Sequence, residues 1–341
     1  MAIRTVVVGM GPRGRDWILE IQQNKEFKLV GCVEVDKQVL QDATRTSRLN
    51  GSPTFTNLSQ ALEGNDIQAV IVATPPEAHL EPCRIALTKK IGVMVEKPFT
   101  TTLSDAITLV RLGAENSTPL LVAQNYRYLR AFRAARDLVT RGVLGPVGLA
   151  VCQYYRIPHE MSASLASMPH SVLWGMGVHH LDMIRYVVNK PVVGVFADSF
   201  TLPWGALPSG ASTRLLLTLQ DDVRVFYGAT YESSGHEYFE RGQEFYARFM
   251  GQRATLHIFH RWLLLCESGK LPRIIRRGPR RVSEEQLLLT QLARAVLDGA
   301  QPESSGLDNL QTMAVVEATI RSARERKWIN PQELLDELQQ S

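Results

Sequence analysis

The chain has few cysteines, and none of them is placed for a metal site or a disulfide framework. Its four cysteines, at positions 32, 83, 152 and 266, lie far apart, and no two are separated by only two residues. Structural zinc sites and redox motifs use such closely spaced pairs. We therefore expect neither a metal site nor disulfides. Cys32 and Cys152, which lie in strand-like runs, are expected to be small core residues.

Long apolar runs and strong charge of one sign are also missing. No apolar stretch approaches the length of about 20 residues that spans a membrane, and the run Thr5–Val8 is too short for a signal peptide. The net charge is only +4, and no basic stripe is interleaved with aromatic residues, so neither nucleic acid nor a membrane is an expected partner. The arginines between 273 and 281 are typical of a solvated face. We expect a cytoplasmic protein.

The chain is long enough for two domains, and the pattern of its elements changes part-way. It has 341 residues, 45% of them hydrophobic. Over residues 1–124, β-branched runs alternate with helical patterns, which predicts a doubly wound parallel sheet, the Rossmann arrangement. Over 125–341, strand-like runs recur with turn residues between them, which is typical of an antiparallel meander, and helices are predicted at the end. We expect a dinucleotide-binding domain at 1–124 and a substrate-binding domain at 125–341.

A glycine-rich turn follows the first predicted strand. It reads Gly9-Met-Gly11-Pro-Arg-Gly14, and a helical pattern comes next. In this context the first glycine permits a tight turn, the second lets a diphosphate approach the backbone, and the third lets helix and strand pack closely. The free N–H groups at the start of the helix attract phosphate. The turn therefore predicts dinucleotide binding.

An acidic residue at the end of the second predicted strand favours NAD. In dinucleotide-binding domains a carboxylate about 20 residues after the first glycine binds the adenosine ribose, and Glu34 follows Gly9 at a similar interval. Such a carboxylate accepts hydrogen bonds from the ribose hydroxyls and repels a 2′-phosphate. Asp36 is a second candidate. Lys37 and Arg13 could offset the repulsion, so NADP stays an alternative.

A charged pair comes at the end of another buried strand. Glu96-Lys97-Pro98 follows the apolar run 91–95, and the proline stops the strand. Thr74-Pro75-Pro76 ends the preceding strand in the same way. In open α/β sheets, ligands bind at the carboxyl ends of the strands. Lys97 is suited there to bind a substrate oxygen or move its proton, because burial and a cationic nicotinamide lower its pKa.

These segments resemble the Gfo/Idh/MocA family, the glucose–fructose oxidoreductase and inositol dehydrogenase group. The resemblance covers essentially the whole chain. Its most specific part is the Thr74-Pro-Pro…His79 segment together with Glu96-Lys97-Pro98. The matching segments are 74–81, 93–99, 124–127, 178–186 and 305–310.

The resemblance implies an NAD(P)-dependent oxidoreductase that transfers a hydride between nicotinamide and a secondary alcohol or ketone of a sugar, cyclitol or related polyol. It also implies a C-terminal α+β domain with a large, open, mostly antiparallel sheet. An open sheet face must be covered, and a homodimer or homotetramer formed through this sheet is the expected arrangement.

The resemblance also implies roles for individual residues. Lys97 is expected between nicotinamide and substrate, and His179, one helical turn before Asp182, is the second expected catalytic residue. The residues expected to contact the cofactor are Gly9, Gly11, Pro12, Arg13, Gly14, Glu34, Thr74, Pro75, His79, Glu96, Lys97 and Asn125. Those expected to contact the substrate are Tyr126, Arg127, Tyr154, Arg156, Trp174 and His179. The two arginines could bind a carboxylate or phosphate.

One position departs from the family pattern. Dehydrogenases of this group usually carry an aspartate four residues before the histidine, where this chain has Gly175. Lys97 and His179 could suffice without it, or another residue could fill the gap. The candidates for that residue are Tyr154, Tyr155, His159 and His170. Alternatively the chain is a non-catalytic NAD-binding regulator, or it cleaves or epimerises a glycoside while its NAD is oxidised and reduced within one cycle.

Overall fold

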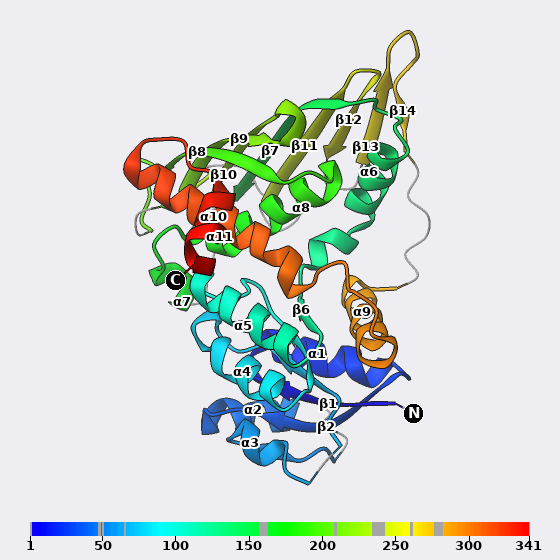
Figure 1. The fold of residues 1–341 in the computed structure, drawn as a ribbon, viewed down its shortest axis with the longest axis vertical. Coiled ribbons are helices and arrows are strands. Elements are labelled where there is room, and N and C mark those ends of the chain that lie inside the picture. The colour runs from blue at the N-terminus through cyan, green and yellow to red at the C-terminus, as the bar shows by residue number, and fades with distance from the viewer. Residues whose placement is uncertain are drawn as a thin grey trace. The chain divides into compact units, whose positions relative to one another are not determined.

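The chain forms two compact units (Figure 1). The computed structural model describes residues 2–46, 49, 51–64, 66–156, 163–207, 210–233, 243–259, 262–275 and 282–340. The first unit contains residues 1–125 and 280–310, and the second contains 126–279 and 311–341. The sequence predicts a single boundary between residues 124 and 125, whereas in the structure the chain also returns to the first unit at residues 280–310.

The first unit is built on a parallel six-stranded sheet. Its strands run in the order β3-β2-β1-β4-β5-β6, and all neighbouring pairs are parallel. The order reverses beside β1, as in doubly wound nucleotide-binding folds, so the predicted Rossmann sheet is confirmed. The strands are β1 (Ile3–Val8), β2 (Phe27–Val33), β3 (Thr54–Phe55), β4 (Ala69–Val72), β5 (Gly92–Val95) and β6 (Leu120–Val122). The helices are α1 (Pro12–Gln23), α2 (Lys37–Thr46), α3 (Leu58–Ala61), α4 (Leu80–Thr88), α5 (Leu103–Glu115) and α9 (Glu284–Asp298).

Apolar strands and one-sided helices make the core of this unit. Both β4 and β5 are buried along their whole length, as expected of parallel strands that are covered on both faces. Helix α1 buries Trp17, Ile18 and Ile21. The Thr102 side chain caps α5 by accepting a hydrogen bond from the N–H of Asp105.

Helix α9 joins the first unit from late in the sequence. Gln286 Nε2 donates to the carbonyl oxygen of Glu20 at 2.7 Å, and Asn24 Nδ2 donates to Gln286 Oε1 at 2.8 Å. A Cβ atom on Gly92 would lie 2.7 Å from a methyl group of Val296. Helix α9 therefore packs closely on both α1 and β5, and its first turn belongs to the same unit as the glycine-rich turn.

The second unit contains an eight-stranded, mostly antiparallel sheet, which confirms the predicted class. The strand order is β14-β13-β12-β11-β7-β10-β9-β8. Only the β7–β10 pair is parallel, and the other pairs are antiparallel. The strands are β7 (Val147–Arg156), β8 (Val192–Phe200), β9 (Ser212–Leu219), β10 (Val223–Thr230), β11 (Gln243–Gly251), β12 (Ala254–Phe259), β13 (Trp262–Glu267) and β14 (Arg273–Ile274). The helices are α6 (Arg130–Thr140), α7 (Ala163–Ser167), α8 (Val178–Val188), α11 (Pro331–Gln340) and most of α10 (Gly306–Glu325).

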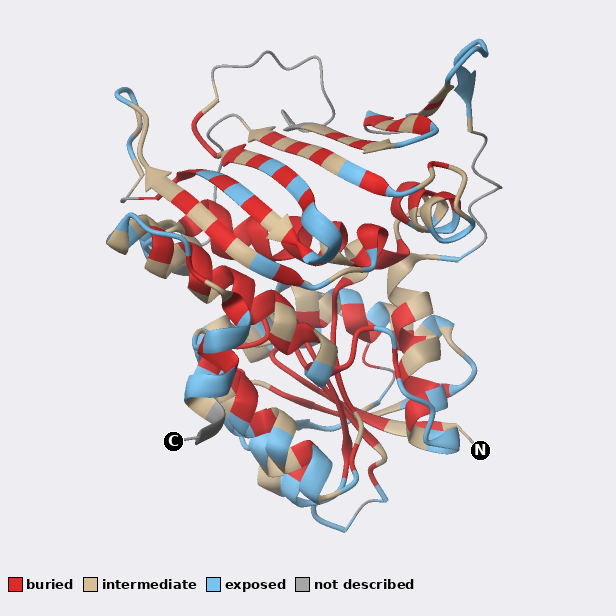
Figure 2. Ribbon diagram, turned by 45° about the horizontal axis from the view of Figure 1, so that its top comes forward, coloured by how far each residue is buried: buried red, intermediate tan, exposed pale blue. Residues whose placement is uncertain are grey.

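The two faces of this sheet differ in burial, as the alternating colours of its strands in Figure 2 show. Tyr227 of β10 is buried, and its hydroxyl lies 3.0 Å from Nδ1 of His180 on α8. The neighbouring Phe226 points to the other face and is 48% exposed. Leu216 and Phe259 are also exposed apolar residues of this sheet. One face thus packs on helices, and apolar side chains are open on the other.

The cysteines are unpaired. Cys32, Cys83 and Cys152 are buried, and burial raises the pKa of the Cys32 thiol to about 12. The core role predicted for Cys32 and Cys152 is confirmed. Within the described ranges, no group of three or more His, Cys, Asp or Glu side chains is arranged to hold a metal ion. None of the described helices is both long enough and apolar enough to cross a membrane.

Candidate functional site

The glycine-rich turn leaves room for a diphosphate. Gly9 has a φ of +90°, and a Cβ atom on Gly14 would lie 1.9 Å from the carbonyl oxygen of Gly9. Above Gly11, by contrast, a Cβ atom would meet nothing within 4 Å. Helix α1 begins at Pro12, and no side chain caps it. The open backbone and uncapped N–H groups fit the diphosphate of a dinucleotide.

Glu34 lies at the end of β2, beside this turn. Its Oε2 atom accepts a hydrogen bond from the N–H of Met10 at 2.8 Å, and its Oε1 atom accepts one from Asp36 at 3.1 Å. The carboxylate is partly exposed. Each of its oxygens can accept a further hydrogen bond, so Glu34 is available to ribose hydroxyls next to the diphosphate position.

Arg13 is bound to Glu96 rather than turned toward Glu34. Its Nε atom donates to Glu96 Oε1 at 2.9 Å, and its second terminal nitrogen lies 2.7 Å from the same oxygen. Trp17 Nε1 donates to that oxygen as well, at 2.9 Å. Arg13 is therefore not free to bind a 2′-phosphate, which agrees with NAD as the cofactor. Glu96 is 6% exposed and positions the start of α1 rather than offering its carboxylate to a ligand.

His79, which was predicted to contact the cofactor, is fully buried. One ring nitrogen faces the carbonyl oxygens of Pro98 and Phe99 at 3.0 and 3.2 Å, and the other faces that of Thr74 at 2.9 Å. Burial lowers the pKa of His79, although the carbonyl groups and Glu96 act in the other direction. The prediction is corrected: the side chain has no open surface for a ligand, and it joins the loops after β4 and β5.

Lys97 follows β5 at the carboxyl edge of the sheet, and the Lys97–Pro98 peptide bond is cis. Burial lowers the pKa of its amine to about 8, although Glu96 raises the pKa; Arg13 lowers it further. Thr74, at the end of the neighbouring strand β4, has a buried hydroxyl with no hydrogen-bond partner in the described structure. Pro75 beside it is exposed. The Lys97 amine and the Thr74 hydroxyl thus lie at the carboxyl edge of the sheet, after two neighbouring strands.

Glu285 of α9 also reaches this edge, and sequence reasoning missed it. Its carboxylate lies 3.5 Å from the Arg13 guanidinium and accepts a hydrogen bond from Asn125 Nδ2 at 3.5 Å. Asn125 follows β6, so it lies at the same end of the sheet as Lys97. No local motif marks Glu285, because its neighbours come from the opposite end of the sequence.

In the second unit, His179 lies in the first turn of α8 and is buried. The ring of Tyr126 stacks on it, with the centroids 4.2 Å apart and the planes 11° apart. Burial raises the pKa of Tyr126 above its usual value. The structure thus brings two of the predicted substrate residues together, and stacking fixes the plane of the His179 ring.

Arg127 was predicted to contact the substrate but lies in a buried ion pair. Its Nε and terminal nitrogen each lie 2.6 Å from one carboxylate oxygen of Asp182. The hydroxyl of Thr312 also donates to Asp182, at 3.0 Å. The Arg127 prediction is corrected, because a two-pronged pair with the fully buried Asp182 uses the guanidinium for structure. Asp182 likewise supports α8 and α10 through these contacts.

Gly175 lies in a turn of π-helix, Leu173–Gly177, that leads into α8. A Cβ atom there would lie 2.1 Å from the hydroxyl oxygen of Tyr231, the residue after β10. Tyr231 therefore fills the space of the missing side chain, and it was not among the candidates. Of those candidates, His170 lies 2.7 Å from the Ser199 hydroxyl, and His159 lies outside the described residues.

The remaining predicted substrate residues differ in their access. Tyr154 and Trp174 are 2% and 8% exposed, so both are packed largely within the protein. Arg156, at the end of β7, is less buried and hydrogen-bonds the Tyr154 side chain. Its Nε atom is buried without a partner among the described residues. Among the residues predicted to contact the substrate, Arg156 therefore has a donor, its Nε atom, that can still form a hydrogen bond.

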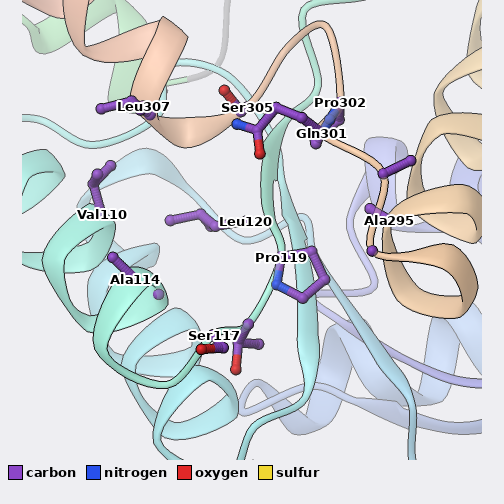
Figure 3. A pocket seen from close by; sticks show the side chains of 14 residues that line it. Val110, Ala114, Ser117, Pro119, Leu120, Ala295, Gln301, Pro302, Ser305 and Leu307 are labelled. Carbon is purple, nitrogen blue, oxygen red and sulfur yellow. The ribbon is translucent and has the colours of Figure 1, made fainter.

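A cavity of about 350 Å³ lies elsewhere in the first unit (Figure 3). Its walls include Val110 and Ala114 of α5, Pro119 and Leu120 at the amino end of β6, and Leu307. The glycine-rich turn and Lys97 follow the carboxyl ends of their strands, so they lie at the other edge of the sheet. None of the residues that line the cavity is titratable. It is not part of the candidate site.

Known proteins share both parts of the chain. A family model described as an oxidoreductase family with an NAD-binding Rossmann fold matches residues 3–124, and one described as the GFO/IDH/MocA C-terminal domain matches 132–257. D-apiose dehydrogenase of Paraburkholderia graminis is 22% identical over 95% of this chain and 88% of that protein. Inositol 2-dehydrogenase of Mycolicibacterium gilvum is 26% identical over 67% of each. An oxidoreductase of Agrobacterium radiobacter, crystallised with NAD+, L-tartaric acid and magnesium, has a TM-score of 0.87 at 19% identity over 98% of this chain and 100% of that one.

The open glycine-rich turn, the uncapped helix and Glu34 identify the first unit as an NAD-binding Rossmann domain. With both family models matched in order, the chain belongs to the Gfo/Idh/MocA family of oxidoreductases.

Proposed function

We propose that the protein is an NAD-dependent dehydrogenase or reductase that acts on a secondary alcohol or ketone of a sugar, cyclitol or related polyol. Lys97 and His179 are its proposed catalytic residues. The observation that carries the proposal is Lys97: an amine whose pKa is lowered to about 8, at the carboxyl edge of an NAD-binding sheet. The relatives named as D-apiose dehydrogenase and inositol 2-dehydrogenase support the substrate class.

The proposed reaction moves a hydride and a proton from the same alcohol. The carbinol carbon gives up a hydride, its hydroxyl oxygen gives up a proton, and a carbonyl group remains. Bound NAD+ supplies the hydride acceptor. In reduction the ammonium form of Lys97 stabilises the developing alkoxide; in oxidation its neutral amine hydrogen-bonds the reacting hydroxyl and, together with the His179 imidazole, accepts the proton. In the reverse direction, the protonated imidazole returns it.

The pKa of Lys97 predicts how the rates of oxidation and reduction should change with pH. Near pH 7 the amine is mostly protonated and stabilises an alkoxide, which favours carbonyl reduction. As the pH rises through about 8, the amine becomes neutral and can itself accept a proton. Oxidation of the alcohol should therefore become faster, and reduction slower, across this range.

Arg156 supports a substrate with an acidic group. Its Nε atom is buried without a partner among the described residues. Its positive charge also acts on the hydroxyl groups of Tyr126, Tyr154 and Tyr231. A carboxylate or phosphate could accept hydrogen bonds from the guanidinium. We expect sugar acids to be better substrates than the matching neutral sugars, and Arg156→Gln to remove that preference.

We also propose that the exposed face of the eight-stranded sheet joins two copies of the chain. Leu216 and Phe226, which pair across β9 and β10, are 40% and 48% exposed, and Phe259 is 42% exposed. Apolar side chains clustered on an open sheet face are typical of subunit interfaces. Light scattering should show a dimer or tetramer, and Phe226→Glu should reduce its size. A monomer in the unmodified protein would contradict this part.

The test is turnover of the cofactor on a panel of polyols, sugars, sugar acids and keto-sugars, followed by the absorbance of reduced nicotinamide. The unmodified protein should reduce NAD+ with at least one of them, and Lys97→Ala and His179→Asn should not. Tight NAD+ binding without turnover on any of them would favour the regulator. A new product by mass spectrometry, without net formation of reduced cofactor, would favour glycoside cleavage or epimerisation.

A further inference from the structure

The side-chain space at Gly175 is filled from another part of the chain. A Cβ atom on Gly175 would lie 2.1 Å from the Tyr231 hydroxyl oxygen and 3.2 Å from the ring carbon that carries it. An aspartate places its carboxylate oxygens about 2.4 Å from its own Cβ, because bonds of about 1.5 and 1.2 Å separate them. The Tyr231 hydroxyl oxygen thus lies at about the distance from the Cβ position of residue 175 at which an aspartate would place a carboxylate oxygen.

Residue 175 lies about one helical turn before His179. It precedes His179 by four positions, and side chains with this spacing lie on the same face of a helix. The π-helical turn that contains Gly175 continues directly into α8. A polar group in the side-chain space of residue 175 is therefore next to the turn that carries His179.

Tyr231 is held firmly in this place. It is 2% exposed, and its N–H donates to the carbonyl oxygen of Ala211 at 3.0 Å. Its ring packs edge-to-face on Tyr154, with the centroids 6.3 Å apart. The next residue, Glu232, is also buried and accepts a hydrogen bond from Leu202 at 3.0 Å. The hydroxyl is thus presented by a fixed ring rather than by a mobile side chain.

We propose that Tyr231 is a positioning residue for His179, and that its hydroxyl replaces the carboxylate that the chain lacks at Gly175. The inference rests on the catalytic role proposed above for His179. Glycine at 175 is then one half of a matched pair, because any larger side chain there must displace Tyr231. If Tyr231 has this role, the protein can be catalytic without an aspartate at position 175.

The exchange alters the electrostatics around the imidazole. Burial raises the pKa of Tyr231, so its hydroxyl stays protonated and neutral. A carboxylate in the same place would be an anion, which stabilises imidazolium and raises its pKa. With Tyr231 in place, no negative charge is added beside the His179 turn from this position.

The first experiment tests the pairing by stability alone. Gly175→Ala should lower the melting temperature by several degrees, because the new methyl group meets the Tyr231 hydroxyl. Combined with Tyr231→Phe, the same change should cost clearly less, since the nearest remaining atoms, a methyl carbon of Leu165 and a ring carbon of residue 231, are then 3.1 and 3.2 Å away. Equal losses in both backgrounds would overturn the pairing.

The second experiment tests the role by NMR titration of the His179 imidazole. Gly175→Asp together with Tyr231→Ala restores a carboxylate in the vacated space, and the pKa of His179 should rise by about 1 unit or more. Tyr246→Phe is the control, since it removes a hydroxyl that lies 3.2 Å from a different histidine, His257, and it should leave His179 unchanged. An unchanged His179 pKa in the double variant would overturn the inference.

Kinetics then separate this inference from the proposed function. On a substrate that the unmodified protein turns over, Tyr231→Phe should lower kcat by about 10-fold to 100-fold with little change in the KM for NAD+. Tyr231→Phe with unchanged kcat and pH profile would contradict the inference and leave the proposed function standing. No turnover by the unmodified protein would contradict the proposed function, while the stability and titration results still decide the pairing.

Discussion

Charged side chains hold the loops of the first unit in place, whereas aromatic rings hold His179 in the second. Around Glu96, Arg13 and Trp17 converge on one carboxylate oxygen, and Glu285 adds a second acid beside the arginine. The ring of Tyr126 stacks on His179. The first arrangement sets the charge beside Lys97, and the second fixes the orientation of an imidazole.

The difference indicates which changes each region should tolerate. Electrostatic effects act over several ångströms, so variants of the first unit should shift pKa values even where the loops keep their shape. Ring stacking and edge-to-face packing depend on contact, so variants of the second unit should act through geometry. The following predictions test this contrast, from the largest expected effect to the smallest.

Lys97→Met should give the largest effect and should act in opposite directions on activity and stability. Turnover should fall by about 1,000-fold or more, since the group that binds the reacting oxygen is lost. The folded protein holds the pKa of Lys97 near 8 instead of 10.5, so keeping the ammonium there opposes folding. This cost is fully present below pH 8 and disappears as the pH rises to the unfolded value.

At pH 7 the Lys97→Met variant should therefore be more stable, by about 1–2 kcal/mol once partial exposure is taken into account. Urea unfolding measures the gain, and Lys89→Met is the control, because Lys89 is exposed. Loss of stability at pH 7 in the Lys97 variant, with no loss in the control, would contradict a half-buried ammonium that opposes folding.

Arg127→Met should destabilise the second unit by about 3 kcal/mol, since it leaves the fully buried Asp182 without its main partner. Urea unfolding should show the loss as a lower midpoint. Combining it with Asp182→Leu removes the stranded charge and should restore most of the stability. A single variant as stable as the unmodified protein would show that the ion pair does not support α8.

Glu34→Gln should weaken NAD+ binding by about 10-fold, because a charge-assisted hydrogen bond to the ribose is replaced by a neutral one. Glutamine keeps an oxygen that can accept the Met10 hydrogen bond, so the turn itself should persist. Titration of the intrinsic fluorescence with NAD+ and NADP+ measures both affinities. Glu26→Gln is the matched control, because Glu26 is an exposed glutamate of the same unit, and an equal loss in that variant would point to net charge rather than to Glu34.

Glu96→Gln should shift the pH dependence of alcohol oxidation to lower pH, by up to about 1 unit. The negative charge of Glu96 raises the pKa of Lys97, so its removal lowers that pKa and moves the ascending limb of the profile downward. Glu285→Gln, which contacts Arg13 rather than Lys97, should shift the limb less. A shift to higher pH in the Glu96 variant would reverse the sign assigned to this carboxylate.

The sequence predicts the first region better than the second, and the reason is the distance along the chain between interacting residues. The roles of Gly9, Gly11 and Gly14 depend on backbone geometry within one turn, and the position of Lys97 depends on the strand before it. Glu285 reaches the same edge only because α9 returns to the first unit late in the chain. No pattern near Glu285 signals that return.

In the second region, the sequence indicates the important residues but not the residues that they contact. Arg127 and Asp182 both lie in motifs that the sequence singles out, yet nothing local shows that they bind each other. The same holds for Gly175 and Tyr231, which the sheet brings together from a helix and a strand end. His79 was assigned to the cofactor by its motif, whereas its burial between two loops depends on the packed structure.

The central claim, hydride transfer by this site, is tested most directly by following one hydrogen. A substrate found in the polyol and sugar panel is prepared with deuterium on the carbinol carbon and incubated with NAD+, and the reduced cofactor is weighed by mass spectrometry. We predict that the reduced cofactor carries the deuterium with the unmodified protein, and that it forms about 1,000-fold more slowly with Lys97→Met. Bound NAD+ that stays oxidised across the panel, or deuterium that returns to the sugar product without net reduction, would contradict it.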